Sequence, residues 1–179
     1  MPLDIGVGIL AALGVAQLFG FEATPLFIAA GIVFALLPDI DVLPAKLSGN
    51  LSIHRTYTHY PIFYLVGFVL MWVLGFPEWA TLLLVGGLLH LVHDTIGLGW
   101  GIRWFWPFSE RKFRFFPDKD GKITSQFFMT WLPHEEAALI REHHNPHWVR
   151  DFYFRPNIVA YVEYGVLIIS LLVLYAYFA

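Results

Sequence analysis

Five apolar stretches dominate this chain and leave it few ways to fold as a soluble protein. They are Leu3–Phe19, Thr24–Leu37, Pro61–Phe76, Glu78–Val92 and Asn157–Ala179. A transmembrane helix needs about 17–25 mostly apolar residues, so the last stretch has full length and the middle ones are short. The chain is 58% hydrophobic and only 14% charged, whereas soluble domains carry about 25% charged residues. We therefore predict an all-α integral membrane protein with about five transmembrane helices.

The length and net charge of the chain further limit the number of domains and the kinds of partner that it can have. With 179 residues the chain has room for one membrane domain, covering 1–179. A net charge of −3 argues against a polyanionic partner such as nucleic acid. The apolar composition makes the lipid bilayer the expected partner. The absence of cysteine removes disulfides, thiolate zinc sites and iron–sulfur clusters. The first residues lack a basic region, so we expect a retained first helix and no signal peptide.

The basic residues predict an orientation. Lys46 and Arg55 lie between the second and third predicted helices, and the other nine, from Arg103 to Arg155, lie between the fourth and fifth. In a five-helix arrangement both segments share a face with the N-terminus, and the positive-inside rule makes that face cytoplasmic. We expect a multi-pass inner (cell) membrane protein with its N-terminus in the cytoplasm and its C-terminus outside.

The segment 95–156, between the fourth and fifth helices, is too long to be a featureless linker. Phe113–Phe116 and Ile123–Phe128 flank a turn-like Asp118–Gly121, which predicts a short β-hairpin. Pro133–His144 has a helical pattern. We therefore expect a cytoplasmic-side segment that contains a β-hairpin and a helix.

The motif LPDID places Asp39 and Asp41 at the end of the second predicted helix. A helix C-terminus carries partial negative charge, which disfavours carboxylates, so this pair needs a cation. Lys46 is the nearest basic residue along the chain. A bound metal ion is one explanation, and a polar stop to an apolar helix is the other.

The motif HRTYTH places His54, Arg55, Thr58 and His59 directly before the third predicted helix. Two histidines five residues apart do not share a helical face, so they fit a loop that folds around a ligand. The alternative is a pair of interfacial histidines beside an anchoring Arg55, with Thr58 as a helix cap. In the metal-site reading, Arg55 stabilises negative charge and Thr58 orients a ligand.

The motif HLVHD ends the fourth predicted helix with His90, His93 and Asp94. His90 and Asp94 are four residues apart and share a helical face. Ionisable side chains within a membrane are costly and mark functional sites. For His93 a helix–helix hydrogen bond is the simpler reading, with a proton-shuttle role as the alternative. Imidazole and carboxylate ligands without sulfur suit zinc, manganese or iron, as one or two ions.

In this order the motifs resemble the YdjM-like (DUF457) family of inner-membrane proteins, which are described as membrane-bound metal-dependent hydrolases. The resemblance rests on LPDID, HRTYTH and HLVHD, followed by WPFS at Trp106–Ser109, and covers roughly Leu37–Phe116. It implies a metal site at six positions, namely Asp39, Asp41, His54, His59, His90 and Asp94.

Two positions depart from the family pattern. Family members often carry a histidine near the start of the first helix, where this chain has Asp4, so Asp4 is a further candidate ligand. They also often carry a threonine where this chain has Gly97, and Thr95 is the residue that could compensate.

These residues favour a hydrolase in which a metal-activated water attacks a phosphoester or related ester, with a lipid-like substrate at the cytoplasmic interface. A multipass metal carrier or sensor is the alternative, although a carrier should place ligands near the bilayer midplane rather than at one end. A membrane scaffold for a cytosolic partner is a third possibility. The sequence does not predict the oligomeric state.

Overall fold

The computed structural model describes residues 1–96, 99–115, 127–143, 145 and 147–179. The chain divides into two compact units. We call Met1–Pro38, Ile62–His90 and Val162–Ala179 the helical unit, and Asp39–Pro61 and Leu91–Tyr161 the loop unit. The long helices are α1 (Pro2–Phe19), α2 (Pro25–Leu36), α4 (Pro61–Val73), α5 (Pro77–Thr95) and α7 (Ile158–Phe178).

The remaining elements are short and lie in the loop unit. The 3₁₀ turns η1 (Leu37–Asp41, whose first two residues belong to the helical unit), η2 (Leu51–Ile53), η3 (Tyr57–His59) and η4 (Pro133–Glu135) accompany the helices α3 (Val42–Ser48) and α6 (Glu136–His143). A π-helical turn, η5, covers Val149–Tyr153. The strands are β1 (Lys112–Phe115) and β2 (Phe128–Trp131).

Glycines bring α1 and α2 into close contact in the helical unit. A Cβ atom added to Gly8 would lie 2.6 Å from the carbonyl oxygen of Gly31, so only glycine fits there. Small residues let backbones approach in this way in membrane helix pairs. Ala12 and Ala16 of α1 and Phe27 of α2 are buried in the core that this contact creates.

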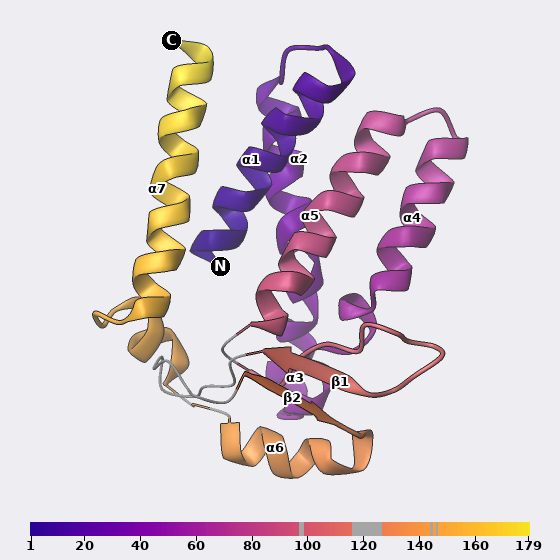
Figure 1. Cartoon of the computed structure of the whole chain (residues 1–179), viewed down its shortest axis with the longest axis vertical. Helices are drawn as coiled ribbons and strands as arrows, with labels where there is room; N and C mark the ends of the chain where they lie inside the picture. Colours follow the sequence, from indigo (N-terminus) through magenta and orange to yellow (C-terminus); the bar gives the residue numbers. More distant parts are fainter. Residues whose placement is uncertain (97–98, 116–126, 144, 146) are drawn as a thin grey trace. The chain divides into compact units, whose positions relative to one another are not determined.

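Local signals explain where these helices begin and end. Thr24 caps α2 by accepting a hydrogen bond from the Phe27 N–H at 3.2 Å, and Pro25 occupies the first turn, where its missing N–H costs nothing. Gly20 ends α1 in the left-handed conformation, with φ of 72°. The helices α4 and α5 form an antiparallel pair joined by a short turn (Figure 1).

The strands of the loop unit pair antiparallel, with Phe113 opposite Thr130 and Phe115 opposite Phe128. Trp100, Trp131 and Ile140 form a small apolar core in this unit. The predicted hairpin and the predicted helix near Pro133 are therefore present.

The second strand lies further along the chain than predicted. It covers Phe128–Trp131 and shares only Phe128 with the predicted strand Ile123–Phe128. Residues 123–126 and the predicted turn Asp118–Gly121 lie outside the described residues. The pairing places the buried Trp131 opposite the buried Lys112, so packing of the tryptophan decides which residues pair.

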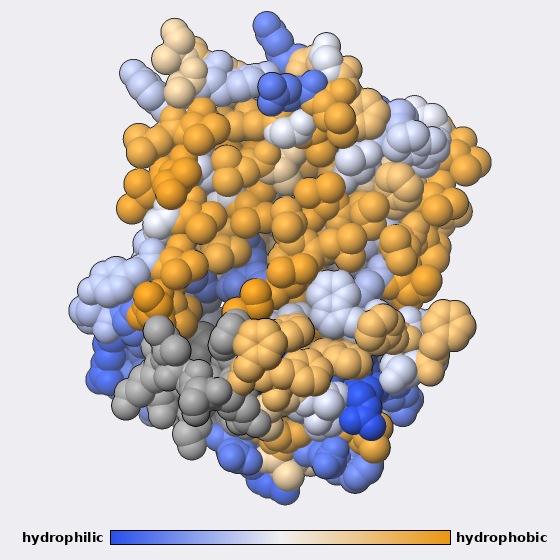
Figure 2. Space-filling model, in the orientation of Figure 1, coloured by the Kyte–Doolittle hydropathy of each residue, from blue (hydrophilic) through white to orange (hydrophobic). Residues whose placement is uncertain are grey.

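By length and composition, three helical stretches among the described residues could cross a membrane: Pro2–Phe19, Pro25–Ser48 and Ile158–Phe178. The helix α4 is apolar but shorter. Apolar residues cover the visible face of the helical unit (Figure 2), and Leu70, Val73 and Leu172 are among its exposed side chains. Exposure of this kind suits contact with lipid rather than water. The chain is thus a mostly helical protein with helices that suit a bilayer, as predicted.

Candidate metal centre

Asp41 joins the end of η1 to the loop that carries the HRTYTH motif. Its Oδ1 lies 2.6 Å from Nδ1 of His54, and its Oδ2 accepts a hydrogen bond from the Arg55 backbone N–H at 3.0 Å. The Thr58 hydroxyl donates to the same Oδ2 at 2.8 Å. Asp41 is 6% exposed as a residue, so these bonds replace water as the partners of its carboxylate. Asp41 therefore holds the loop in place.

His59 completes this arrangement from η3. Its Nδ1 lies 3.1 Å from Asp41 Oδ2, while its Nε2 lies 3.2 Å from Asp94 Oδ2 and 3.9 Å from Asp39 Oδ1. The imidazole is fully buried. An aspartate on Nδ1 fixes the ring orientation and the tautomer that presents Nε2 as a metal ligand. Asp39, His59 and Asp94 thus bring ligand atoms within 4.8 Å of one another.

A second group of the same kind shares His59. Ligand atoms of Asp41, His54 and His59 also lie within 4.8 Å of one another. The two imidazole rings meet edge to face, with centroids 5.2 Å apart. However, both oxygens of Asp41 already accept hydrogen bonds, which makes Asp41 a better positioning residue than a metal ligand.

Arg55 holds Asp94 at the end of α5. One guanidinium nitrogen donates to Asp94 Oδ1 at 2.7 Å and another to the Asp94 backbone carbonyl at 3.0 Å. This cation also offsets the partial negative charge of the helix end, where a carboxylate is otherwise disfavoured. Arg55, predicted to stabilise charge on a substrate, therefore positions a candidate ligand.

Backbone and aromatic contacts fix the Arg55 side chain. Its own φ is +62°, the left-handed conformation that most residues avoid. The indole of Trp100 lies 5.6 Å from the guanidinium carbon, a cation–π distance, and the His54 ring meets the same indole edge to face. Gly99, with φ of +88°, lies so close that an added Cβ would overlap the guanidinium.

A buried charge cluster lies in the same unit. Glu136 accepts from Lys112 Nζ at 2.5 Å and from Arg103 at 2.8 Å, and Arg103 also donates to the Tyr60 hydroxyl at 2.9 Å. Burial lowers the pKa of Lys112 to about 8, although Glu136 opposes this shift. Tyr60 stacks on Trp106 with centroids 4.5 Å apart, which ties the residue after His59 to this cluster.

Thr95 has a structural role at the end of α5. Its hydroxyl donates to the Leu91 carbonyl at 2.7 Å and accepts from the Trp104 indole N–H at 2.8 Å. These bonds anchor the segment after the helix. Gly97, where family members often have a threonine, lies outside the described residues. The idea that Thr95 compensates for that threonine therefore stays a prediction.

The helical unit contains a second aspartate–histidine pair. Asp4 Oδ1 lies 3.2 Å from Nδ1 of His90, and both residues are 2% exposed. Glu163 on α7 is also buried and accepts from the Leu3 backbone N–H at 3.2 Å. In both this pair and the Asp41–His59 pair, an aspartate oxygen lies close to Nδ1 of the histidine. This contact favours orientation of His90 over direct ligation by Asp4.

The loop unit therefore brings together most of the residues that the sequence predicted, namely Asp39, Asp41, His54, Arg55, Thr58, His59 and Asp94. His90 lies in the helical unit beside Asp4, and His93 is half-buried on α5. Sequence reasoning missed Gly99, the contact of Trp100 with Arg55, and the Lys112–Glu136 pair. The closely spaced glycines around Trp100 could have indicated a tight turn, but no local pattern marks the charge pair.

The donor set fits a divalent metal. It combines carboxylate oxygens with an imidazole nitrogen and contains no sulfur, which suits zinc, manganese or iron. Asp41 supplies the outer carboxylate that commonly orients a ligating histidine. The two carboxylates of Asp39 and Asp94 would together neutralise the two positive charges of such an ion, although Asp94 also pairs with the Arg55 guanidinium.

Apolar helices and a buried His/Asp cluster define this chain as a helical membrane protein with a candidate metal centre. Residues 4–179 match the family described as YdjM inner membrane protein, and the chain belongs to that family. It is 32% identical over 125 residues to the inner membrane protein YbcI of Escherichia coli (strain K12). That match covers 63% of this chain and 66% of YbcI. No solved structure is significantly similar to the chain.

Proposed function

We propose that this protein is a membrane-bound metal-dependent hydrolase whose ion is held by Asp39, His59 and Asp94. The observation that carries the proposal is the placement of His59 between Asp41 on one ring nitrogen and Asp39 and Asp94 on the other. Such a carboxylate–histidine arrangement is typical of metal sites. His90 is the proposed fourth ligand, because it precedes Asp94 by one turn of α5.

The other residues of the loop unit position these ligands. Asp41 orients His59, and Thr58 and the Arg55 backbone N–H hold Asp41. The Arg55 guanidinium holds Asp94. His54 extends the network through Asp41 and is the ligand that a second ion would use. His93, next to Asp94 in sequence and half-buried, is the proposed proton carrier.

When bound, a divalent ion lowers the pKa of a coordinated water, to about 7 for zinc, and so supplies a nucleophile at neutral pH. The proposed substrate is a lipid-like phosphoester or related ester. Two features of the loop unit support a lipidic substrate: Phe105 and Phe108 are 60% and 94% exposed, and basic residues such as Arg111 accompany them. Aromatic and basic side chains together suit the headgroup layer of a membrane.

The proposed topology has five membrane crossings, with the loop unit and the N-terminus in the cytoplasm and the C-terminus outside. It is supported by the distribution of charge, because all eleven Lys and Arg residues lie between 46 and 155 and none falls within the helical unit. The 13 residues of α4 rise only about 20 Å. A crossing by α4 therefore requires a thinned bilayer or polar residues that reach to its surface.

A metal carrier or sensor is the second candidate. It is favoured by the burial of the ligands, since His59 is fully buried and Asp94 is 8% exposed. A catalytic centre must admit substrate and water, whereas a storage or sensing site need not. Asp39, whose side chain is 17% exposed, is the ligand through which a hydrolase would receive its substrate.

The test compares purified wild type with Asp39→Asn, His59→Ala and His90→Ala, and with Asp151→Asn as a control on the surface of the loop unit. Bound metal is measured by elemental analysis after supply of Zn²⁺ or Mn²⁺. Hydrolysis is measured on bis(p-nitrophenyl) phosphate and on phosphatidylglycerol vesicles. We expect metal and turnover in wild type and control, and loss of both in the site variants. Metal without turnover would favour the carrier or sensor, and equal metal in all five proteins would exclude the site.

A further inference from the structure

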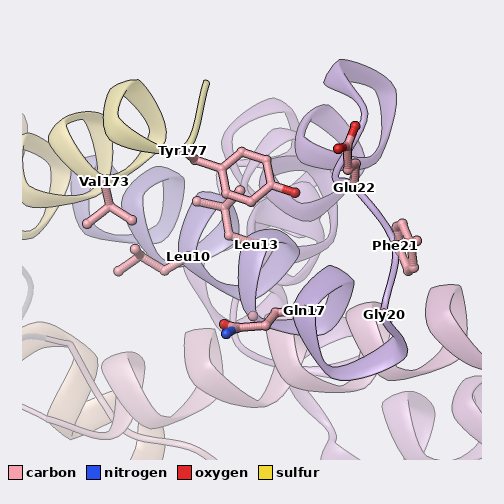
Figure 3. Close-up of a pocket in the computed structure, with 9 residues that line it drawn as sticks. Leu10, Leu13, Gln17, Gly20, Phe21, Glu22, Val173 and Tyr177 are labelled. Atoms are coloured by element: carbon pink, nitrogen blue, oxygen red, sulfur yellow. The ribbon is translucent and has the colours of Figure 1, made fainter. Parts of the chain in front are cut away.

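The helical unit has a groove whose lining includes none of the histidines and aspartates of the candidate metal centre. It is a cavity of about 680 Å³ between α1 and α7, at the end of α1 that leads into α2 (Figure 3). Its walls come from three places: α1, the turn after it and the last turns of α7. They are Leu10, Leu13, Gly14, Gln17, Gly20, Phe21, Glu22, Val173 and Tyr177.

The lining changes from apolar to polar along the groove. Leu10 and Val173 lie near each other at one end, and the Tyr177 hydroxyl points toward the side where Glu22 lies, whereas the Gln17 amide points away from both (Figure 3). Both α1 and α7 are long and apolar enough to cross a membrane. A groove on such helices is filled by lipid or by another helix, because neither water nor empty space is stable beside hydrocarbon.

The polar end matches a particular headgroup chemistry. The Tyr177 hydroxyl accepts the Ala23 backbone N–H at 2.8 Å and keeps its own O–H to donate. This hydroxyl can therefore donate to a phosphate oxygen. Glu22 offers an exposed carboxylate, which can bind an ammonium group.

Charge in the helical unit favours a zwitterionic lipid over an anionic one. This unit contains no Lys or Arg in its sequence, so no basic side chain within it competes for Glu22 or attracts an acidic headgroup. We propose that the groove between α1 and α7 binds one phospholipid whose headgroup carries a primary ammonium, as in phosphatidylethanolamine. One acyl chain lies along Leu10, Leu13 and Val173, and the headgroup lies at Glu22 and Tyr177.

Gly14 provides a way to close the groove without disturbing the fold. It lines the cavity, and a Cβ added there meets no atom within 4 Å. Leucine at this position fills the groove and also favours the helix. Gly165 on α7 is a matched control, because an added Cβ there also meets nothing within 4 Å and the residue does not line the groove.

The experiment uses delipidated full-length protein in detergent and adds phosphatidylethanolamine, phosphatidylcholine or phosphatidylglycerol. Lipid binding is measured by native mass spectrometry. We expect wild type and Gly165→Leu to bind phosphatidylethanolamine best. Gly14→Leu should bind it about tenfold more weakly, the effect of about two lost methylene contacts. Glu22→Gln should lose the preference for phosphatidylethanolamine over phosphatidylcholine, because only a primary ammonium donates hydrogen bonds to a carboxylate.

Several outcomes would overturn the proposal. One is equal phosphatidylethanolamine binding by Gly14→Leu and Gly165→Leu. Another is a wild type with no preference among the three lipids. A wild-type dimer that Gly14→Leu alone dissociates would show that a second copy of the chain fills the groove. Circular dichroism of each variant checks that its helical content equals that of wild type, so a loss of binding is assigned to the groove and not to unfolding.

Discussion

The imidazole of His59 lies between two aspartates, with Nδ1 3.1 Å from Asp41 Oδ2 and Nε2 3.2 Å from Asp94 Oδ2. The first aspartate is held by hydrogen bonds from Thr58 and from the Arg55 backbone, and the second by the Arg55 guanidinium. One loop therefore fixes both neighbours of the ring. The two aspartates then have separable roles, one orienting the histidine and the other binding the ion.

The Asp41→Asn variant tests that separation. An amide keeps the size of the carboxylate but carries no charge, so it orients His59 less well. Loss of such an outer carboxylate typically weakens metal binding about 10- to 100-fold. We expect this effect in zinc titrations of Asp41→Asn, while Asp39→Asn, which changes a ligand, removes binding altogether. Equal affinities in wild type and Asp41→Asn would show that Asp41 does not act through His59.

Gly99 and Gly49 form a matched pair for testing the close contact between Gly99 and the Arg55 guanidinium. Both have positive φ, +88° and +67°, but an added Cβ overlaps the Arg55 guanidinium only at Gly99. Alanine in the left-handed conformation costs about 1 kcal/mol at either position. Gly99→Ala should cost about 3 kcal/mol more, because it displaces Arg55 and leaves Asp94 as a buried charge.

Thermal unfolding in detergent measures the difference between these two variants, and a zinc titration reports on the site. We expect Gly49→Ala to bind metal as wild type does and Gly99→Ala to bind it weakly. If both variants lose the same stability and keep the same affinity, the contact between Gly99 and Arg55 has no structural role.

Residue patterns predicted the helices and the identity of the clustered residues well. The predicted stretch Leu3–Phe19 differs from α1 by one residue, and Pro133–His144 overlaps η4 and α6. Apolar runs, prolines at helix starts and glycines at helix ends are local signals, which is why they are readable from one sequence. Grouping of the motifs on one membrane face stays a prediction, which rests on the placement of Lys and Arg.

The roles within the cluster could not be predicted in the same way. Arg55 and Asp94 are 39 residues apart in the chain, and nothing local to either residue indicates that they pair. The left-handed backbone at Arg55 likewise has no sequence signal, because arginine does not favour that conformation. Similarly, Lys112 becomes buried because β1 pairs with the strand that carries Trp131.

The Lys112–Glu136 pair predicts a pH dependence of stability. Burial lowers the pKa of Lys112 from 10.5 to about 8, so between these values the folded protein binds fewer protons than the unfolded chain. Folding stability therefore rises as pH increases from 8 toward 10.5, and the charged lysine costs up to about 3 kcal/mol below pH 8. Lys112→Met removes this cost, and Arg103 still pairs with Glu136.

Unfolding of wild type and Lys112→Met is compared at pH 7.5 and pH 10. We expect wild type to gain stability relative to the variant at the higher pH. Parallel behaviour of the two proteins would show that Lys112 keeps an ordinary pKa. Lys46→Met is the control, since Lys46 is exposed and its replacement should leave the pH dependence unchanged.

Gly8 and Gly14 on α1 should respond in opposite ways to alanine. A Cβ at Gly8 would lie 2.6 Å from the Gly31 carbonyl oxygen, which forces α1 and α2 apart, whereas a Cβ at Gly14 meets nothing within 4 Å. Overpacking of this kind costs about 1–3 kcal/mol, while alanine in place of a helical glycine gains about 1 kcal/mol. Gly8→Ala should therefore unfold at a lower temperature than wild type and Gly14→Ala at a higher one. Similar shifts for both variants would mean that the contact between the two helices is not as close as 2.6 Å implies.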